Sequence, residues 1–505
     1  MFIEASWQSS DLFPSPQQLI FSIMDSIPYF IFAVVWIVIS AFLYGYHISA
    51  LNSAQDAISC HSASLSNELN PSSFAWTAPC IAMSETLFGL LTASYTIGGF
   101  LGSLYASRLA DNYGRKHALL TASALIGSGS IIMSISNAFF FILFGRTIIG
   151  IGCGLNTVLV PIYLSEISPP SIRGSIGVMN QLAIVIGIFI SQLISLPFAK
   201  SYDWRWIFAI SAAVSLFHLF TSPLMIESPK WVLEQKEKYT KKSDATDSNQ
   251  QSQQNDDFED NSTLLTIEDM DHSAIERQLL LNSTAHDGSN QSLALNVGFK
   301  DPISISQLLM DWRSDPALAN GLKIVLLTQI AQQLSGINAV LYYSTSIMKS
   351  VLPTQAIYIS LFICAINLLM TFPPIFLVDR LGRKSLLLFS LASMALTSFT
   401  LAISINYAFA KVSSIAIVLF VASFSVGLGP VPFVIFSEIV PAYAVSAAGS
   451  LGLSVNWASN FLVGMIFLPM RNALSSPDGD GDGNVFFVFT FVTFLFAILI
   501  HQNYK

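Results

Sequence analysis

The sequence predicts an all-α membrane protein with twelve transmembrane helices in two six-helix repeats, joined by a central cytoplasmic linker. Of its 505 residues, 53% are hydrophobic and only 11% are charged, whereas soluble domains are about 25% charged. A short loop motif, Asp-x-x-Gly-Arg-Lys, occurs at Asp111–Lys116 and again at Asp379–Lys384. The composition makes lipid the solvent for much of the chain, and the repeated motif indicates a duplicated unit.

Apolar runs long enough to cross a bilayer recur along the chain. About twenty helical residues cross the roughly 30 Å hydrocarbon core, and helices satisfy their own backbone polar groups in lipid. No Lys or Arg precedes Arg108, so we expect the first run to remain as a span rather than act as a signal peptide. The twelve predicted spans begin near residues 28, 86, 117, 139, 175, 205, 321, 355, 386, 413, 442 and 484.

These spans divide the chain into five parts. The predicted parts are an N-terminal cytoplasmic tail at 1–27, a six-helix bundle at 28–226, a cytoplasmic linker at 227–320, a second six-helix bundle at 321–501 and a C-terminal tail at 502–505.

The net negative charge of the chain lies in its centre. Residues 227–323 hold 17 Asp and Glu against 9 Lys and Arg, and the remainder holds 14 of each. The stretch at about 243–296 is rich in Ser, Asn, Gln and Asp, a composition that cannot bury enough apolar area to fold, so we predict disorder. Because the linker shares a membrane face with both Gly-Arg-Lys loops, it is expected in the cytoplasm, and its sequons at Asn261, Asn282 and Asn290 should be unglycosylated.

Two of the four cysteines, Cys60 and Cys80, fall in the polar loop between the first two spans. If that loop faces the outside, the two can pair as a disulfide. The alternative is two free thiols.

A second pair of matches supports the duplication. Ser165–Pro169 resembles Ser437–Pro441 at an offset of 272 residues, close to the 268 residues between the two loop motifs. The basic residues of each loop are placed to reach helix C-termini and the downstream glutamates, which would latch one membrane face shut. The alternative is that these residues only anchor the helices at the lipid headgroups. The predicted latch residues are Arg115, Lys116, Glu166, Arg173, Asp379, Arg383, Lys384 and Glu438.

The two copies differ at one latch position. Arg173 stands eight residues after Ser165, whereas Val445 stands eight residues after Ser437. We therefore predict a weaker latch in the second half.

Several motifs together resemble the sugar-porter branch of the major facilitator superfamily, and most closely the animal facilitative glucose transporters. The resemblance covers nearly all of residues 28–500 and implies hexose uniport, D-glucose above all, by alternating access in the plasma membrane. The motifs are Gly145-Arg146, Pro161 to Gly174, Glu227-Ser228-Pro229-Lys230, Gln332 to Asn338 and Asp379 to Lys384.

Polar residues within the spans suit a sugar, because amides donate and accept hydrogen bonds as hydroxyls do. Gln332 and Gln333 share a helical face, but Asn338 lies on the opposite side of an unbroken helix. We predict a bend at Ser335-Gly336 and another break at Gly427–Pro432, since interrupted spans near the midplane mark transporter sites.

The resemblance implies individual roles for these residues. Three departures limit this transfer, because Phe433 stands where the family usually has Trp, Ser425 where it has Glu, and Gln329–Ala331 where several glucose-selective members read Gln-Leu-Ser. The alternative is that some of these amides only form hydrogen bonds between helices. Gln181, Gln332, Gln333, Asn338, Asn367 and Asn456 match hydroxyl-binding positions, Phe433 matches a site aromatic, Tyr342 and Tyr343 match the external gate, and Asn460 is an additional candidate.

The first span reads Gly45-Tyr46-His47, where proton-coupled relatives place an Asp and passive ones an Asn. Passive transport is therefore expected, with proton symport through His47 as the alternative. A sugar sensor that signals through the linker is a second alternative. No P-loop occurs and the His residues are scattered, so we expect no ATP motor, enzyme activity, metal site, cofactor or nucleic-acid partner.

Overall fold

The computed structural model describes residues 27–51, 54–60, 80–198, 200, 203–236, 303–313, 315–340, 356–475 and 481–504. Within these ranges the regular elements are all helical. The first half contains α2 (Ile27–Ser49), α3 (Gln55–Ile58), α4 (Glu85–Tyr113), α5 (Arg115–Ile135), α6 (Phe139–Ile167), α7 (Arg173–Phe198) and α8 (Trp204–Phe220). The second half contains α11 (Ile305–Asp311), α12 (Pro316–Leu334), α14 (Ala356–Met370), α15 (Phe372–Leu381), α16 (Arg383–Asn406), α17 (Ala410–Val426), α18 (Val431–Ile439), α19 (Val445–Leu474) and α20 (Asn484–Asn503).

Among these residues, eleven segments are long and apolar enough to cross a membrane. The remaining predicted span, the seventh, corresponds to α12 and a further helical turn at 337–340, and α12 begins at Pro316 rather than near residue 321. The predicted fold class, a helical membrane protein of two six-helix halves, is confirmed.

Helical turns also occur inside the stretch predicted as linker, at 229–236 and in α11. The acidic stretch predicted to be disordered, at about 243–296, lies outside the described residues.

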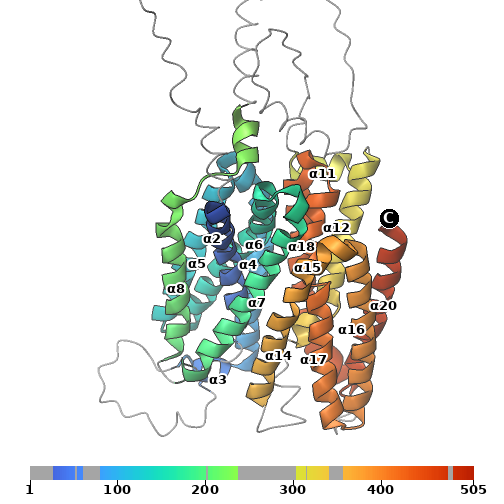
Figure 1. Cartoon of the computed structure of the whole chain (residues 1–505). Coiled ribbons are helices and arrows are strands. Elements are labelled where there is room, and N and C mark those ends of the chain that lie inside the picture. The colour runs from blue at the N-terminus through green and yellow to red at the C-terminus, as the bar shows by residue number, and fades with distance from the viewer. Residues whose placement is uncertain are drawn as a thin grey trace, which may run out of the picture.

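The two halves stand side by side as bundles of roughly parallel and antiparallel helices (Figure 1). They meet along two seams, where α4 packs against α19 and where α7 packs against α14 and α15. The start of α12, α11 and the C-terminal end of α20 lie at the same end of the molecule (Figure 1). We call this the linker end.

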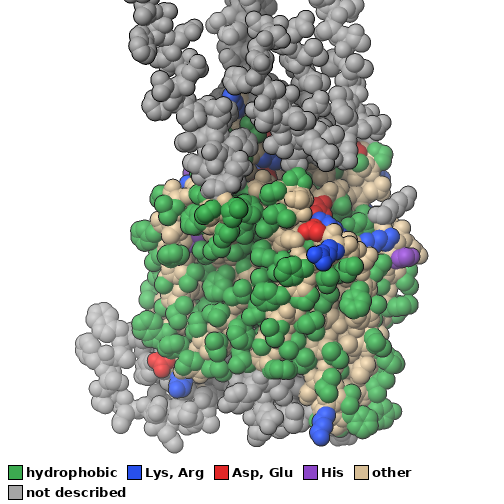
Figure 2. Space-filling view, in the orientation of Figure 1, with side chains coloured by type: hydrophobic (Ala, Val, Ile, Leu, Met, Phe, Trp, Pro, Cys, Tyr) green, Lys and Arg blue, Asp and Glu red, His purple; other side chains and the backbone are tan. Residues whose placement is uncertain are grey.

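On the face shown in Figure 2, the flank of the molecule between its two ends carries mostly hydrophobic side chains, and the charged side chains lie toward the ends. Its exposed side chains include Phe140 at 67%, Phe376 at 67%, Leu396 at 67% and Phe491 at 66%. Such a belt suits lipid, because acyl chains solvate apolar side chains and offer no partner to a charge.

Glycines allow the closest helix contact in the first half. An ideal Cβ on Gly102 of α4 would lie 2.1 Å from the carbonyl oxygen of Ile151, and one on Gly154 of α6 would lie 2.1 Å from that of Gly99. Neither helix could hold this separation with larger residues. This tight pair gives α4 a fixed position, from which its other face meets α19 of the second half.

Candidate functional site

The seventh span bends at the predicted position. Helix α12 ends at Leu334, and Gly336 has φ +89, a conformation that side chains with a Cβ rarely adopt. An ideal Cβ there would also lie 2.7 Å from the Phe489 ring of α20. The bend brings Asn338 back to the face of Gln333, to which its amide nitrogen donates a hydrogen bond.

The tenth span breaks between α17 and α18. Residues 427–430 interrupt the helix, so the carbonyls of Leu428 and Gly429 are free to accept other bonds. The Gln332 amide nitrogen donates to both, at 3.0 Å and 2.9 Å. The two broken helices are therefore joined at their breaks.

A third helix completes this amide cluster. The Asn456 amide nitrogen on α19 donates to the side-chain oxygens of Gln329 at 2.9 Å and Gln332 at 2.8 Å. The Gln333 amide nitrogen in turn donates to the Asn456 oxygen at 2.9 Å. All of these side chains are buried, so the cluster is a block of donors and acceptors held inside an apolar bundle.

The first half reaches this cluster through α7. An ideal Cβ on Gly429 would lie 3.4 Å from the Gln181 amide nitrogen. Gln181, which is buried, thus faces the break of the tenth span from across the boundary between the halves. A ligand bound here would touch both halves, as alternating access requires.

The other residues predicted from the resemblance lie near the cluster or outside the described residues. Phe433 is 5% exposed on α18, one residue after Pro432, whose carbonyl accepts from the Gln329 amide nitrogen at 3.3 Å. Asn367 of α14 is bonded to Ser425 at the end of α17, 2.7 Å away. The predicted gate, Tyr342 and Tyr343, lies outside the described residues.

Asn460 follows Asn456 by one turn of α19. It is 5% exposed, and its side-chain oxygen has no hydrogen-bond partner among the described residues. A buried amide oxygen without a partner is costly, and a ligand hydroxyl would satisfy it.

His47 of α2 lies in a separate polar cluster within the first half. Its Nε2 is 2.7 Å from the Ser211 hydroxyl and 3.3 Å from that of Ser130. Its backbone carbonyl accepts from Arg146 at 2.9 Å. In the part of the chain that the structure describes, the groups that bond to His47 are hydroxyls and this guanidinium, with no carboxylate among them.

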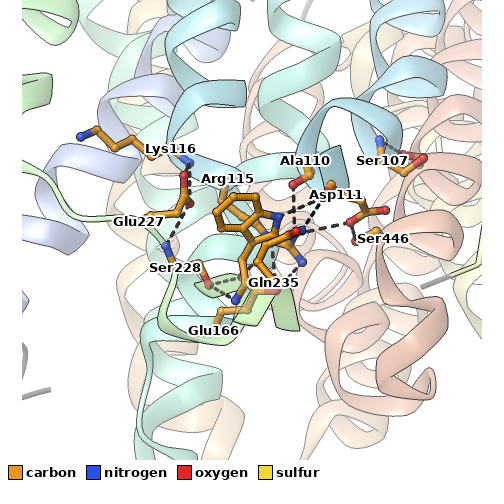
Figure 3. Close-up of polar contacts among 12 residues, drawn as sticks. Ser107, Ala110, Asp111, Arg115, Lys116, Glu166, Glu227, Ser228, Gln235 and Ser446 are labelled. Atoms are coloured by element: carbon orange, nitrogen blue, oxygen red, sulfur yellow. Dashed lines mark hydrogen bonds and ion pairs between the residues drawn. The ribbon is translucent and has the colours of Figure 1, made fainter. Parts of the chain in front are cut away.

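At the linker end, Arg115 pairs with Glu166 in the first half (Figure 3). Two nitrogens of the guanidinium contact the carboxylate, at 3.0 Å and 2.8 Å, and Ser228 donates to the same carboxylate at 2.6 Å. The side chains of Arg115 and Glu166 are only 4% and 6% exposed. The geometry is that of a bidentate, largely desolvated pair.

Glu227 caps the start of α5 beside this pair. The backbone nitrogen of Lys116 donates to its carboxylate at 2.9 Å, whereas the Lys116 side chain extends away from it (Figure 3). The carboxylate passes close over Gly114, where an ideal Cβ would lie only 2.3 Å from Oε2. Lys116 thus contributes to this corner through its backbone, and the motif glycine leaves room for the acid.

The second half repeats the pair in a more exposed form. Arg383 contacts Glu438 at 2.6 Å and Asp379 at 2.9 Å. The Arg383 and Glu438 side chains are 22% and 20% exposed. Tyr504 lies nearby, and its burial and the Glu438 charge raise the pKa of its phenol to about 12.

The space over the second motif glycine is open. Apart from the adjoining backbone and chain neighbours, no atom of the described residues lies within 4 Å of an ideal Cβ on Gly382, in contrast to the covered Gly114. Among the described residues, the Lys384 side chain has no hydrogen-bond or ion-pair partner.

The aspartates of the two motifs reach across to the opposite half. Asp111 accepts from Ser446 at the start of α19, and Asp379 accepts from the hydroxyl of Ser175 near the start of α7 at 2.6 Å. The Ser175 backbone nitrogen also donates to Asp379 at 3.0 Å. Arg173 opens α7 two residues earlier, and its role in the latch stays a prediction.

Serines extend the first of these contacts into a ladder along α4 and α19. Each step moves four residues along one helix and four residues back along the other, as an antiparallel pair requires. Serines recur every four residues on both helices. This spacing is the feature of the sequence from which the ladder could have been predicted. The contacts are between the hydroxyls of Ser103 and Ser454 at 2.9 Å, from the backbone nitrogen of Ser107 to the hydroxyl of Ser450 at 3.0 Å, and from the hydroxyl of Ser446 to the carboxylate of Asp111 at 2.9 Å.

At the opposite end of the molecule, Cys60 and Cys80 form a disulfide, with their Cα atoms 5.4 Å apart. It ties α3 to the segment before α4, where the Ile81 backbone nitrogen also donates to the Ile58 carbonyl at 2.8 Å.

The chain is similar to known proteins over most of its length. The family model for sugar (and other) transporters matches residues 32–503. The chain is 28% identical over 470 residues to the probable metabolite transport protein YBR241C of Saccharomyces cerevisiae, covering 91% of this chain and 89% of that protein. It is 30% identical over 464 residues to the facilitated glucose transporter protein 1 of Caenorhabditis elegans, covering 88% and 82%.

Solved structures show the same fold. The chain superimposes on the proton:xylose symporter XylE bound to 6-bromo-6-deoxy-D-glucose with a TM-score of 0.69, covering 94% of this chain and 96% of that one, at 21% sequence identity. At this identity the likeness concerns the fold alone.

Proposed function

Because the chain belongs to the family of sugar (and other) transporters, we propose that it carries hexoses, D-glucose above all, passively across a membrane by alternating access. It is a multi-pass membrane transporter and not an enzyme.

The observation that carries the proposal is the buried amide cluster at the two helix breaks. Gln332, Gln333 and Asn456 exchange hydrogen bonds there, and Gln181 approaches from the other half. Each amide offers both a donor and an acceptor, which matches a polyol whose hydroxyls do both. A sugar entering here replaces amide–amide bonds with amide–hydroxyl bonds, so no buried polar group is left without a partner.

The contacts at the linker end support a closed state on that side. Asp111 and Asp379 each hold the start of a helix in the opposite half, and the two Arg–Glu pairs keep the motif loops against the bundles. Opening this end requires the cross-half contacts to separate. We propose that these contacts are the latch of the alternating cycle.

The disulfide supports the orientation. Disulfides persist in oxidising compartments, so the loop holding Cys60 and Cys80 would face the outside or a lumen, and the linker end the cytoplasm. The N- and C-termini are then cytoplasmic. The resemblance to the animal facilitative glucose transporters implies the plasma membrane, which we include in the proposal.

The surroundings of His47 support uniport. A proton-driven cycle needs a group that exchanges a proton as the cavity changes side, usually with a carboxylate in the relay. The described partners of His47 are two serine hydroxyls and the Arg146 guanidinium. Such a histidine is a hydrogen-bonding residue of the bundle.

The test is substrate counterflow in liposomes containing the purified protein. Glucose, galactose, fructose and mannose are compared, and Gln333→Leu is compared with Asn406→Ala, which lies at the far end of α16 bonded to Asn484. We expect glucose counterflow that Gln333→Leu reduces at least tenfold and Asn406→Ala leaves near wild type. Hexose binding without counterflow would identify a sensor and overturn the proposal.

A further inference from the structure

Ser425 and Asn367 form a buried pair beside the candidate sugar site. The hydroxyl of Ser425 lies 2.7 Å from the side-chain oxygen of Asn367, and the two residues are 0% and 1% exposed. The same hydroxyl lies 2.8 Å from the carbonyl of Val421, one turn earlier on α17. The backbone of Asn367 is fixed as well, because its carbonyl accepts from the Thr371 hydroxyl at 2.7 Å.

The pair stands next to the break of the tenth span. Ser425 is two residues before Gly427, and the Leu428 carbonyl beyond it accepts from Gln332. Ser390 of α16 holds this stretch in place, since its hydroxyl accepts from the Leu428 backbone nitrogen at 3.0 Å. Ser425 therefore directly precedes a break whose backbone is held by side-chain hydrogen bonds from two other helices.

The chemistry of the pair decides which side of the amide faces the substrate. A serine hydroxyl has one proton, and an amide has an oxygen that accepts and a nitrogen that donates two. When the hydroxyl donates to the amide oxygen, that oxygen is directed at Ser425 and the two N–H groups are turned away from it. A hydroxyl that donated to Val421 instead could only accept from the amide, which would turn an N–H group toward Ser425 and the amide oxygen away from it.

We infer that Ser425 is a positioning residue that holds Asn367 with its amide nitrogen toward the substrate, making Asn367 a donor to one sugar oxygen. This assignment rests on the proposed hexose transport. It names a specificity element at a position where the family resemblance implied a glutamate, whose carboxylate could only accept.

Monofluoro and monodeoxy glucoses test the assignment, because a carbon-bound fluorine accepts weakly but cannot donate. Their inhibition constants are measured in glucose counterflow for wild type, Ser425→Ala and Ser425→Thr. At one ring position we expect the wild type to tolerate fluorine while binding the deoxy analogue about tenfold more weakly, the size of one hydrogen bond.

In Ser425→Ala the glucose KM should rise several-fold with kcat retained, and the gap between fluoro and deoxy analogues should close. Ser425→Thr, which keeps the hydroxyl, should restore both. A wild type that loses fluoro and deoxy analogues equally at every position would overturn the assignment, and so would an unchanged pattern in Ser425→Ala. Absence of glucose counterflow in the wild type would overturn the proposed function itself, so the two failures are distinct.

Discussion

The carboxylate of Asp111 in the first half accepts a hydrogen bond of 2.9 Å from the hydroxyl of Ser446 in the second half. The same carboxylate lies 3.4 Å from Arg115, which pairs with Glu166. One side chain thus belongs both to the charge network within a half and to the seam between the halves. Separation of the halves at this end therefore disturbs the charge network, and a weakened network loosens the seam.

Removal of the ladder hydroxyls should favour the state that is open at the linker end. Each buried hydrogen bond contributes about 0.5–1.5 kcal/mol, so the double variant Ser446→Ala/Ser454→Ala should shift the population several-fold. Spin-label distances across the linker end, or alkylation of an introduced cysteine there, would measure the shift. Ser128→Ala is the matched control, because that exposed hydroxyl bonds only within its own helix, to Leu125. An unchanged distance distribution would count against the ladder as part of the latch.

The two Arg–Glu pairs should not be equivalent. Glu166→Ala leaves the Arg115 guanidinium, 4% exposed, without its main partner, and loss of one member of a buried pair costs about 3–5 kcal/mol. In Glu438→Ala, Arg383 keeps Asp379 as a partner, and its side chain is already more exposed than that of Arg115. We therefore expect a loss of only about 1 kcal/mol of stability, as for surface pairs.

Thermal unfolding in detergent and glucose counterflow measure these two variants side by side. Equal losses would contradict the predicted weaker second latch. The sequence predicted this asymmetry from Arg173 and Val445, whereas the structure supports it through the burial of Arg115 and the extra Ser228 hydrogen bond.

The motif glycines provide a second internal comparison. Gly114 and Gly382 both have positive φ, at +92 and +82, so an alanine strains either one by about 1–2 kcal/mol. Only Gly114 also lies under a carboxylate, that of Glu227, and an added methyl would displace this cap of α5, at a further cost of about 1 kcal/mol.

Gly114→Ala should therefore lower the melting temperature more than Gly382→Ala. In the background of Glu227→Ala the difference between the two glycine substitutions should disappear. Persistence of the difference in that background would show that the cap is not its cause.

Most of the fold follows from hydropathy, because twenty apolar residues in lipid have few alternatives to a helix. The bend at Gly336 was also predictable, since Gln333 and Asn338 could share a site only if the helix broke between them. Apart from the two Arg–Glu pairs, the partners of single polar groups were not predictable. Glu227 has no periodic signal that assigns it to the start of α5, because that contact depends on how distant segments meet.

The disulfide should stabilise the outer loop without taking part in transport. Cys60 and Cys80 are 20 residues apart in sequence, and closing a loop of this size contributes about 3 kcal/mol in chain-entropy models. Reduction should lower the melting temperature of the wild type and leave that of Cys60→Ser/Cys80→Ser unchanged. Peptide mapping with and without reductant identifies the bond directly. Two free thiols in protein from an oxidising compartment would contradict both the bond and the orientation inferred from it.

Sugar uptake should not respond to a proton gradient. His47 bonds to Ser211 and Ser130, and a glutamine can keep a hydrogen bond to a hydroxyl while having no proton to exchange near neutral pH. In liposomes with an imposed pH difference, glucose should equilibrate and not accumulate, and His47→Gln should transport at a rate within a few-fold of wild type. Accumulation against a gradient that is lost in His47→Gln would make the protein a proton symporter. Accumulation that survives the substitution would also exclude uniport, and would place the coupling group elsewhere in the chain.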